Sequence, residues 1–399
     1  MFLELLKRRN PKLIDAAITL HQQGYLPANC YVLDLDAIED NSRAFAEAAG
    51  RLGLTVFAMT KQIGRHSGAC KAMIDGGISS SVAVDMACAV ATHRAGMNVG
   101  HLGHLVQVPR SEADLAAKQI APDFWTVFSL EKAAEAAGAA LRAGRVQALM
   151  ARVHAQDDIF YRGHEGGFDH RSITEVADAF DKSDGSRFAG VTTFPAMLFD
   201  NQKRKVVPTP NLGTLARTAE TLASTGRTGF QINAPGTTST AVLQQLADAG
   251  ATQCEPGNGL HGTTPLHALQ DLPEDPAVAY LTEVSHHFGG RAYCFCGGLY
   301  VDPVFPDYAV HAVVGSEPDS TNTHSVEMPT ATSIDYYAMI DCSGPRKPRA
   351  GDSVVFGFRG QAFVTRAWVA GIRGIKRGKP EVTTIENVFG EARPWPALV

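Results

Sequence analysis

The stretch VFAMTKQIGRH, residues 56–66, decides how the rest of the chain is interpreted. A short apolar run ends in a single lysine, Lys61, which is followed by a glycine and two basic residues. An apolar run closed by turn residues predicts a buried strand, and barrels and open α/β sheets keep their reactive groups at strand ends. Desolvation there favours the neutral amine, which attacks a carbonyl carbon and forms a Schiff base. A lysine that extends along the surface into solvent is the structural alternative.

Length and composition favour one large barrel with a smaller second domain. The 399 residues are 45% hydrophobic and 19% charged, with a net charge of −5. This balance gives no reason to expect nucleic-acid binding, and no apolar run approaches the roughly 20 residues of a membrane-spanning helix. Seven scattered cysteines, an odd number, favour a reducing cytosol over a disulfide scaffold. We therefore expect a cytoplasmic protein that binds neither nucleic acid nor membrane.

Apolar runs alternate with helical patterns over residues 29–272, and this alternation predicts an α/β fold, a closed (β/α)8 TIM-type barrel. Residues 1–28 are expected to form an N-terminal helical segment. Beyond residue 272 prolines cluster and helical periodicity is lost, so residues 273–399 are predicted to form a separate, mainly β domain. The strands expected before residue 272 lie at residues 30–36, 58–61, 79–83, 102–108, 126–128, 148–153, 189–194, 229–233 and 252–255.

A glycine and several hydroxyl residues follow an apolar strand in NAPGTTST, residues 233–240, ahead of a helical pattern at 241–249. Backbone N–H groups, hydroxyls and the positive end of a helix dipole together attract an anion. The candidate anion ligands are Thr237, Thr238 and Ser239. An ordinary helix N-cap is the alternative.

A second glycine-rich loop, EPGNGLHGTT at residues 255–264, comes one βα unit later, where barrels commonly build a phosphate site. Its glycines allow the backbone to approach a ligand closely. Glu255 ends the preceding strand and is expected to point into the barrel mouth. A buried glutamate needs a partner, which is either a protonated pyridine nitrogen or an arginine in a structural ion pair.

A Schiff-base lysine, a phosphate cradle and a carboxylate for a ring nitrogen are the three parts that pyridoxal 5'-phosphate requires. With these parts the chain resembles the alanine racemase-like (fold type III) enzymes, which combine a barrel with a β domain and include the ornithine and diaminopimelate decarboxylases. It most resembles the YhfX-like group of proposed amino-acid racemases. The resemblance spans nearly the whole chain. It rests on residues 33–61, 152–167, 233–240 and 255–262.

This resemblance implies a role for each candidate residue. Lys61 would carry the cofactor and act as the base on one face of the substrate. Glu255 falls where alanine racemases have an arginine and where the decarboxylases have a glutamate. A carboxylate favours the protonated ring, so decarboxylation stays open beside racemisation. The other implied cofactor contacts are Arg152, His154, Thr237, Thr238, Ser239, Gly257 and Asn258.

A racemase needs a second acid or base on the opposite face of the substrate. Cys296 or Tyr300, in the stretch CFCGGLY, occupies the corresponding region, although cysteines packed in a β core are an equal alternative. No second cysteine pair stands at zinc spacing, so no metal is expected. The substrate-binding candidates are Arg162, Asp335 and Arg359.

We therefore expect a pyridoxal phosphate-dependent amino-acid racemase or epimerase, an isomerase that works as a homodimer with shared active sites. The alternative reaction is decarboxylation of the ornithine or diaminopimelate type, with lyase or aldolase chemistry after it. A cofactor-homeostasis protein is a further alternative, but such proteins are single barrels without a β domain. The sequence does not identify the amino acid.

Overall fold

The computed structural model describes residues 1–295, 308–330 and 332–394. The chain divides into two compact units, and each is discontinuous in sequence. The first, here called the β unit, comprises Met1–Ser42, Lys61–Ala72 and Leu260–Val399. The second, the barrel unit, comprises Arg43–Thr60 and Met73–Gly259.

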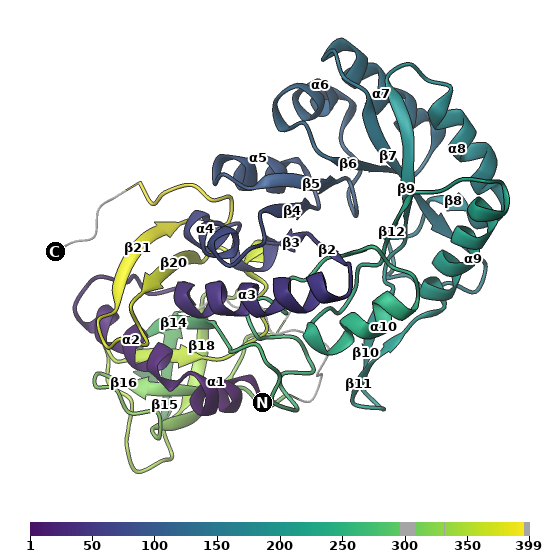
Figure 1. Cartoon of the computed structure of the whole chain (residues 1–399). Helices are drawn as coiled ribbons and strands as arrows, with labels where there is room; N and C mark the ends of the chain where they lie inside the picture. The colour runs from purple at the N-terminus through teal and green to yellow at the C-terminus, as the bar shows by residue number, and fades with distance from the viewer. Residues whose placement is uncertain (296–307, 331, 395–399) are drawn as a thin grey trace. The chain divides into compact units, whose positions relative to one another are not determined.

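The barrel unit contains a parallel sheet that nearly closes on itself. Its strand order is β2-β13-β12-β9-β7-β6-β5-β4-β3, and the neighbouring strands pair in parallel. The two end strands of this sheet are β2 (Thr55–Val56) and β3 (Ala58–Met59). Only Phe57 separates them in the chain, so the two edges of the sheet lie next to each other. Helices lie outside these strands in Figure 1. This confirms the predicted TIM-type barrel.

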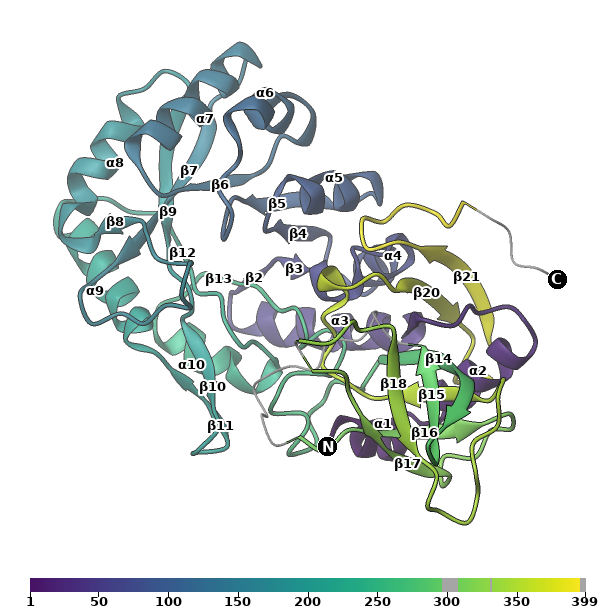
Figure 2. The same cartoon turned by 180° about the vertical axis from the view of Figure 1, so that it is seen from behind.

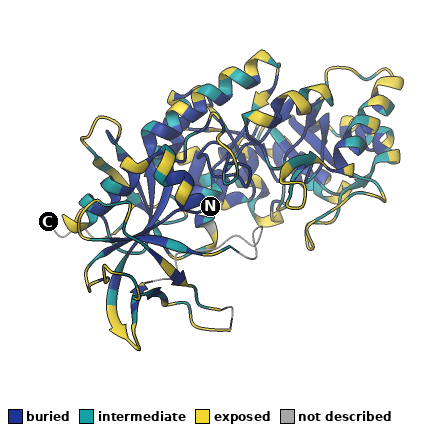
Figure 3. Cartoon of the chain, turned by 90° about the horizontal axis from the view of Figure 1, so that it is seen from below, coloured by how far each residue is buried: buried dark blue, intermediate teal, exposed yellow. Residues whose placement is uncertain are grey.

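Each inner strand of the barrel is short and apolar, and its helix follows it in the chain. Along β7 seven consecutive residues are buried, as expected of a strand covered on both faces. Buried residues gather in the strands, whereas the outer helix faces are exposed (Figure 3). The remaining strands are β4 (Ser80–Ala83), β5 (Asn98–Leu102), β6 (Phe124–Val127), β7 (Gln147–His154), β9 (Ser186–Thr192), β12 (Gln231–Asn233) and β13 (Gln253–Cys254). The helices are α5 (Met86–Arg94), α6 (Ala113–Leu115), α7 (Leu130–Arg142), α8 (Ile173–Asp181), α9 (Pro210–Ser224) and α10 (Leu243–Asp248).

The β unit contains an antiparallel barrel, seen from behind in Figure 2. Strands β14, β15, β18, β17, β16 and β19 pair in that order, and β19 pairs again with β14. This confirms the predicted C-terminal β fold. The strands are β14 (Val278–Phe288), β15 (Arg291–Phe295), β16 (His311–Gly315), β17 (Thr323–Glu327), β18 (Tyr337–Asp341), β19 (Ser353–Phe356), β20 (Trp368–Arg373) and β21 (Glu381–Glu386).

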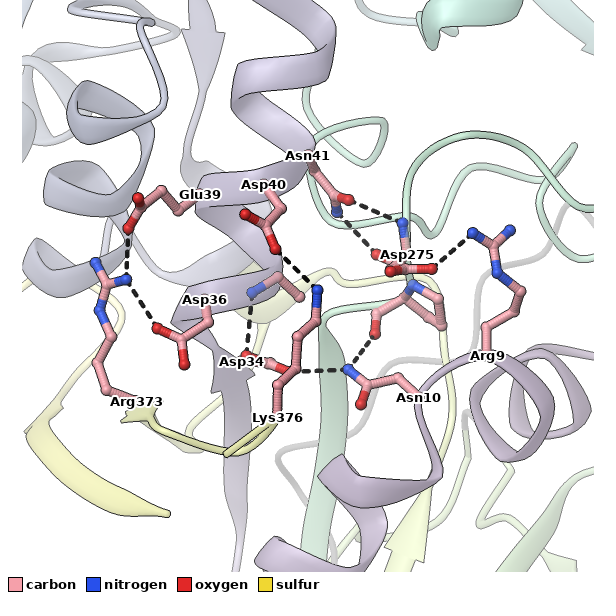
Figure 4. Close-up of polar contacts among 12 residues, drawn as sticks. Arg9, Asn10, Asp34, Asp36, Glu39, Asp40, Asn41, Asp275, Arg373 and Lys376 are labelled. Carbon is pink, nitrogen blue, oxygen red and sulfur yellow. Dashed lines mark hydrogen bonds and ion pairs between the residues drawn. The ribbon is translucent and has the colours of Figure 1, made fainter. Parts of the chain in front are cut away.

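Two N-terminal helices, α1 (Phe2–Arg9) and α2 (Pro11–Gln22), belong to the core of the β unit. Their leucines and isoleucines pack with residues of β1, β14 and β20. Between the helices, the Asn10 side chain donates to Asp34 Oδ2 at 2.9 Å and to the Pro276 carbonyl at 3.0 Å (Figure 4). On α3 (Leu35–Arg51), Asp36 accepts from Arg373 at 3.0 Å, which ties this helix to β20.

Two strand assignments from the sequence were wrong. The run at residues 30–36 was expected to open the parallel barrel, but β1 (Cys30–Asp34) pairs antiparallel with β14 and parallel with β20 in the β unit. All five of its residues are buried, and a fully buried run fits either sheet equally well. The strand expected at 102–108 lies earlier, as β5, because Gly103 has a φ of +79° and ends it.

Candidate active site

Glu255 stands immediately after β13 and is only 4% exposed. Its Oε1 accepts a hydrogen bond from His101 Nδ1 at 2.6 Å and another from Asn233 Nδ2 at 2.9 Å. Its Oε2 lies 3.4 Å from His104 Nε2 and has no hydrogen-bond partner among the described residues. One carboxylate oxygen therefore accepts two hydrogen bonds, whereas the other accepts none from the described residues.

Parallel strands deliver these side chains to one place. His101 belongs to β5, Asn233 ends β12 and Glu255 follows β13. Because these strands are parallel members of one nearly closed sheet, their carboxyl ends lie at the same end of the barrel. That end is where barrel enzymes carry their active sites.

The electrostatics of this cluster favour an ionised carboxylate. Burial alone would raise the pKa of Glu255, but His104 and His101 beside it and hydrogen bonds from His101 and Asn233 hold that pKa below its usual range. The side chain therefore carries a buried negative charge at neutral pH, and that charge needs cationic or N–H partners.

His101, His104 and Glu255 also place three possible metal-ligand atoms within 4.8 Å of one another. The 2.6 Å between His101 Nδ1 and Glu255 Oε1 is the length of a hydrogen bond between a ring N–H and a carboxylate. Two ligands about 2.0–2.1 Å from one tetrahedral ion would lie roughly 3.3 Å apart. The observed distance therefore fits a shared proton better than a shared cation.

Arg152, on β7, is fully buried inside the barrel unit. Its Nη2 donates to the carbonyls of His164 and Phe194, and the guanidinium lies 4.6 Å from the centroid of the Phe128 ring. Its Nε and Nη1 have no hydrogen-bond partner among the described residues. Burial lowers the pKa of Arg152 to about 10, so the group stays protonated at neutral pH. A buried cation with unused donors is suited to an anionic oxygen.

Aromatic contacts connect this arginine to the glutamate. The Phe194 ring lies 5.5 Å from the His104 ring, edge-on, and 6.0 Å from the His164 ring, stacked. Glu255, His104, Phe194 and Arg152 therefore form one continuous set of contacts in the barrel unit.

The two glycine-containing loops are in contact. A Cβ atom on Gly259 would lie 2.3 Å from the Thr238 carbonyl oxygen, so only glycine permits this approach. Thr238 and Ser239 are buried and Thr237 is half-buried. Asn258 is buried and Gly257 half-buried in the facing loop. The structure therefore brings the two predicted phosphate segments together.

The helix expected after this loop is shorter than the sequence indicated. A 3-10 turn at Thr240–Val242 comes first, and α10 has six residues. The Thr237 N–H is already bonded to the Met197 carbonyl at 2.9 Å. Any anion here would depend on the hydroxyls and on other loop N–H groups more than on a helix dipole.

Lys61 begins a 3-10 turn, Lys61–Ile63, that belongs to the β unit and follows β3 in the chain after one residue. Its side chain is half-buried. Gly64 ends the turn with a φ of +65°, and a Cβ there would lie 2.8 Å from Val369 Cγ2. Arg65 then donates to the Val388 carbonyl at 2.7 Å, and His66 Nε2 lies 2.9 Å from Thr384 Oγ1. Arg65 and His66, the two basic residues that follow the lysine in sequence, therefore fasten this turn to β21 and to the residues just after it.

The other predicted residues are scattered. His154 ends β7, half-buried, and its ring contacts Phe160 edge-on. Arg162 is exposed in the loop after β7. Asp335 pairs with Arg366 at 3.0 Å, and Arg359 is half-buried after β19. Cys296 and Tyr300 lie outside the described residues.

Sequence reasoning missed His101 and His104, which contact Glu255, and it placed Asn233 in a phosphate segment without predicting its contact with Glu255. The available signal was the spacing of His101 and His104 on either side of a glycine at the end of an apolar strand. The misplaced strand at 102–108 hid this signal, because it put His101 outside the sheet.

No helix among the described residues is long and apolar enough to cross a membrane.

Comparisons with known proteins identify relatives of this chain. Residues 33–265 match the family model described as alanine racemase, N-terminal domain, and residues 279–382 match that of the YhfX-like C-terminal domain. The chain is 40% identical over 394 residues to the uncharacterized protein YhfX of Escherichia coli K12, covering 98% of this chain and 99% of that protein.

Solved structures share the fold at low identity. D-threonine aldolase from Filomicrobium marinum has a TM-score of 0.65 and 16% identity, covering 92% of this chain and 96% of its own. Alanine racemase of Clostridium difficile 630, complexed with cycloserine, has a TM-score of 0.62 and 14% identity, covering 91% and 99%. D-threo-3-hydroxyaspartate dehydratase from Delftia sp. HT23 has a TM-score of 0.65 and 15% identity, covering 90% and 97%. These likenesses concern the fold alone.

Proposed function

Because the chain belongs to the YhfX-like branch of the alanine racemase family, whose fold binds pyridoxal phosphate, we propose that it is a pyridoxal phosphate-dependent amino-acid racemase or epimerase. One observation carries the proposal. Inside the barrel unit, Glu255 Oε2 lacks a hydrogen-bond donor and Arg152 Nε and Nη1 lack an acceptor among the described residues.

The cofactor suits both groups. Its ring nitrogen, when protonated, supplies an N–H for the buried carboxylate, and its phenolic oxygen supplies an anionic acceptor for the guanidinium. Satisfying buried polar atoms is worth about 1–3 kcal/mol for each group. An apolar ligand would leave both the carboxylate and the guanidinium unsatisfied.

Other residues would also bind the cofactor. Lys61 Nζ is the proposed point of covalent attachment, and His154 the proposed second contact on β7. When bound, the cofactor supplies an electron sink that acidifies the Cα–H of an attached amino acid. The proposed phosphate contacts are Thr237, Thr238, Ser239, Gly257 and Asn258.

Two side chains would carry out the removal and return of the Cα proton. Neutral Lys61 Nζ accepts the Cα proton on one face of the substrate, and Cys296 or Tyr300 returns one on the opposite face. Arg162, Asp335 and Arg359 are the proposed substrate contacts, and the Asp335–Arg366 pair is the competing structural role for Asp335. We further propose a homodimer in the cytoplasm.

Decarboxylation is the second candidate, because the ionised state of Glu255 favours a protonated ring and thus a strong electron sink. The cofactor-homeostasis alternative is disfavoured by the complete antiparallel barrel of the β unit.

Purified protein loaded with pyridoxal phosphate and incubated with an amino-acid panel in deuterated water tests the proposal. Deuterium at Cα with inversion and no carbon dioxide supports racemisation. Carbon dioxide release identifies a decarboxylase instead, and cleavage of a β-hydroxy amino acid identifies an aldolase or dehydratase. No exchange and no product with any amino acid would overturn the proposal.

A further inference from the structure

We propose that His101 and Asn233 are positioning residues that hold the Glu255 carboxylate ionised and leave only its Oε2 for the ligand. This inference rests on the proposed function, because the ligand group it serves is the ring nitrogen of the cofactor.

Two chains of hydrogen bonds, here called arms, meet at Glu255 Oε1 and come from different strands of the barrel, β5 and β12. In the first, Thr126 Oγ1 lies 2.5 Å from His101 Nε2, and His101 Nδ1 lies 2.6 Å from the carboxylate. In the second, the Thr192 hydroxyl donates to Asn233 Oδ1 at 2.7 Å, and Asn233 Nδ2 donates to the carboxylate at 2.9 Å. His101, Asn233 and both threonines are fully buried.

The outer hydroxyls fix which atom faces the glutamate. Because Thr192 donates to Asn233 Oδ1, the amide must turn its N–H₂ group toward Glu255. Because Thr126 can satisfy His101 Nε2 as donor or as acceptor, His101 Nδ1 keeps its hydrogen for the carboxylate in both protonation states. Each arm therefore presents a donor to the carboxylate, which can only accept hydrogen bonds when it is ionised.

Two donors on one oxygen determine what the other oxygen can do. Oε1 is saturated by His101 and Asn233, while Oε2 is 3.4 Å from His104 Nε2 and makes no hydrogen bond to a described residue. Burial raises the pKa of a carboxyl group, and the donors of the two arms counter that effect. When one arm is lost, the pKa of Glu255 rises, so the carboxyl group takes up a proton and becomes a donor. A protonated Glu255 no longer matches a ring N–H.

A double-mutant cycle on cofactor affinity tests this dependence. Pyridoxal phosphate is titrated into the apo forms of the wild type, His101→Leu, Glu255→Gln and the double variant. We expect His101→Leu and Glu255→Gln each to bind at least about tenfold more weakly, and the double variant no more weakly than Glu255→Gln. His101→Asn, whose amide can replace Nδ1–H as a donor, should recover most of the affinity. Additive losses would overturn the inference, since a purely structural histidine would act independently of Glu255.

Matched control variants distinguish a loss of cofactor contact from a loss of folding. His93→Leu, on the exposed face of α5, should leave affinity unchanged. If His101→Leu does not fold, Thr126→Val replaces it in the cycle, with Thr92→Val, a buried threonine of α5, as its control. A wild type that binds no pyridoxal phosphate would contradict the proposed function itself. A wild type that binds, with an additive cycle, would contradict only the positioning role.

Discussion

The backbone N–H of Ser67 donates a hydrogen bond to Oε2 of Glu386 at 2.8 Å, and the Ser67 hydroxyl bonds the same carboxylate. Ser67 is the first residue of α4 (Ser67–Asp75), and Glu386 is the last residue of β21. A carboxylate at this position satisfies an N–H that the helix itself cannot use and interacts favourably with the helix dipole. Since only three residues separate the Lys61 turn from α4, Glu386 helps to fix the orientation of the proposed reactive lysine.

Glu386→Gln should therefore weaken the lysine turn. A charge-assisted hydrogen bond in a buried setting contributes about 1.5–3 kcal/mol, and we expect the free energy of unfolding to fall by about that amount. Urea denaturation followed by circular dichroism measures the loss. Glu381→Gln, at the exposed start of β21, is the control and should change stability by less than about 0.5 kcal/mol. Equal effects of the two variants would contradict the assigned role.

His261 should make the protein acid-sensitive. Burial, with a smaller effect of His267, lowers the pKa of His261 to about 3, compared with about 6.5 in an unfolded chain. Between these values the unfolded state binds a proton that the folded state does not. Stability is therefore lost as the pH falls below about 6.5, by up to about 1.4 kcal/mol per pH unit from this group.

His261→Gln should flatten the dependence of the urea midpoint on pH between about 6 and 4.5. The exposed variant His93→Gln should retain the wild-type slope. An unchanged slope in His261→Gln would show that other groups cause the acid sensitivity.

Arg152→Met should separate stability from cofactor binding. Removing a buried guanidinium with two unused nitrogens costs little stability, so the apo protein should unfold at the same or a higher temperature. Pyridoxal phosphate should bind at least about tenfold more weakly, because an ionic hydrogen bond is lost. Equilibrium titration and thermal melts measure the two effects, with exposed Arg142→Met as the control. Unchanged cofactor affinity would contradict the proposed contact.

Gly259→Ala should separate the two facing loops. The added methyl group would meet the Thr238 carbonyl oxygen at 2.3 Å, so one loop must move away from the other. We expect a stability loss of about 1–3 kcal/mol and weaker binding of pyridoxal phosphate. Gly50→Ala, on α3 with open space around the site of the Cβ, should be neutral or stabilising by up to about 1 kcal/mol. If Gly259→Ala keeps wild-type stability and normal cofactor affinity, these two loops do not form the phosphate site.

The parallel barrel was predictable because its strands are short apolar runs, each followed by a helical pattern. β1 was not, since its partners, β14 and β20, follow it by more than 200 residues and leave no local signal. An entirely buried pentapeptide satisfies a parallel or an antiparallel sheet equally. The fold class was therefore read correctly while one of its strands was assigned to the wrong sheet.

Glu255 could be singled out from sequence because a glutamate at the end of an apolar strand, before a Pro-Gly turn, has few structural explanations. Its partners could not, because His101 lies 154 positions away and a lone histidine in an apolar strand is usually a core residue. Their role depends on which strand ends the closed sheet brings together, and β5 is not even a neighbour of β13 in that sheet. That adjacency is a property of the closed sheet and has no counterpart in local sequence.

Reductive trapping of the cofactor tests the central claim most directly. The protein is loaded with pyridoxal phosphate, reduced with borohydride and digested, and the modified peptide is identified by mass spectrometry. We predict one phosphopyridoxyl group on Lys61, no labelling in Lys61→Ala, and unchanged labelling in Lys71→Ala, an exposed lysine of α4. Modification of a different lysine, or labelling that persists in Lys61→Ala, would contradict the account.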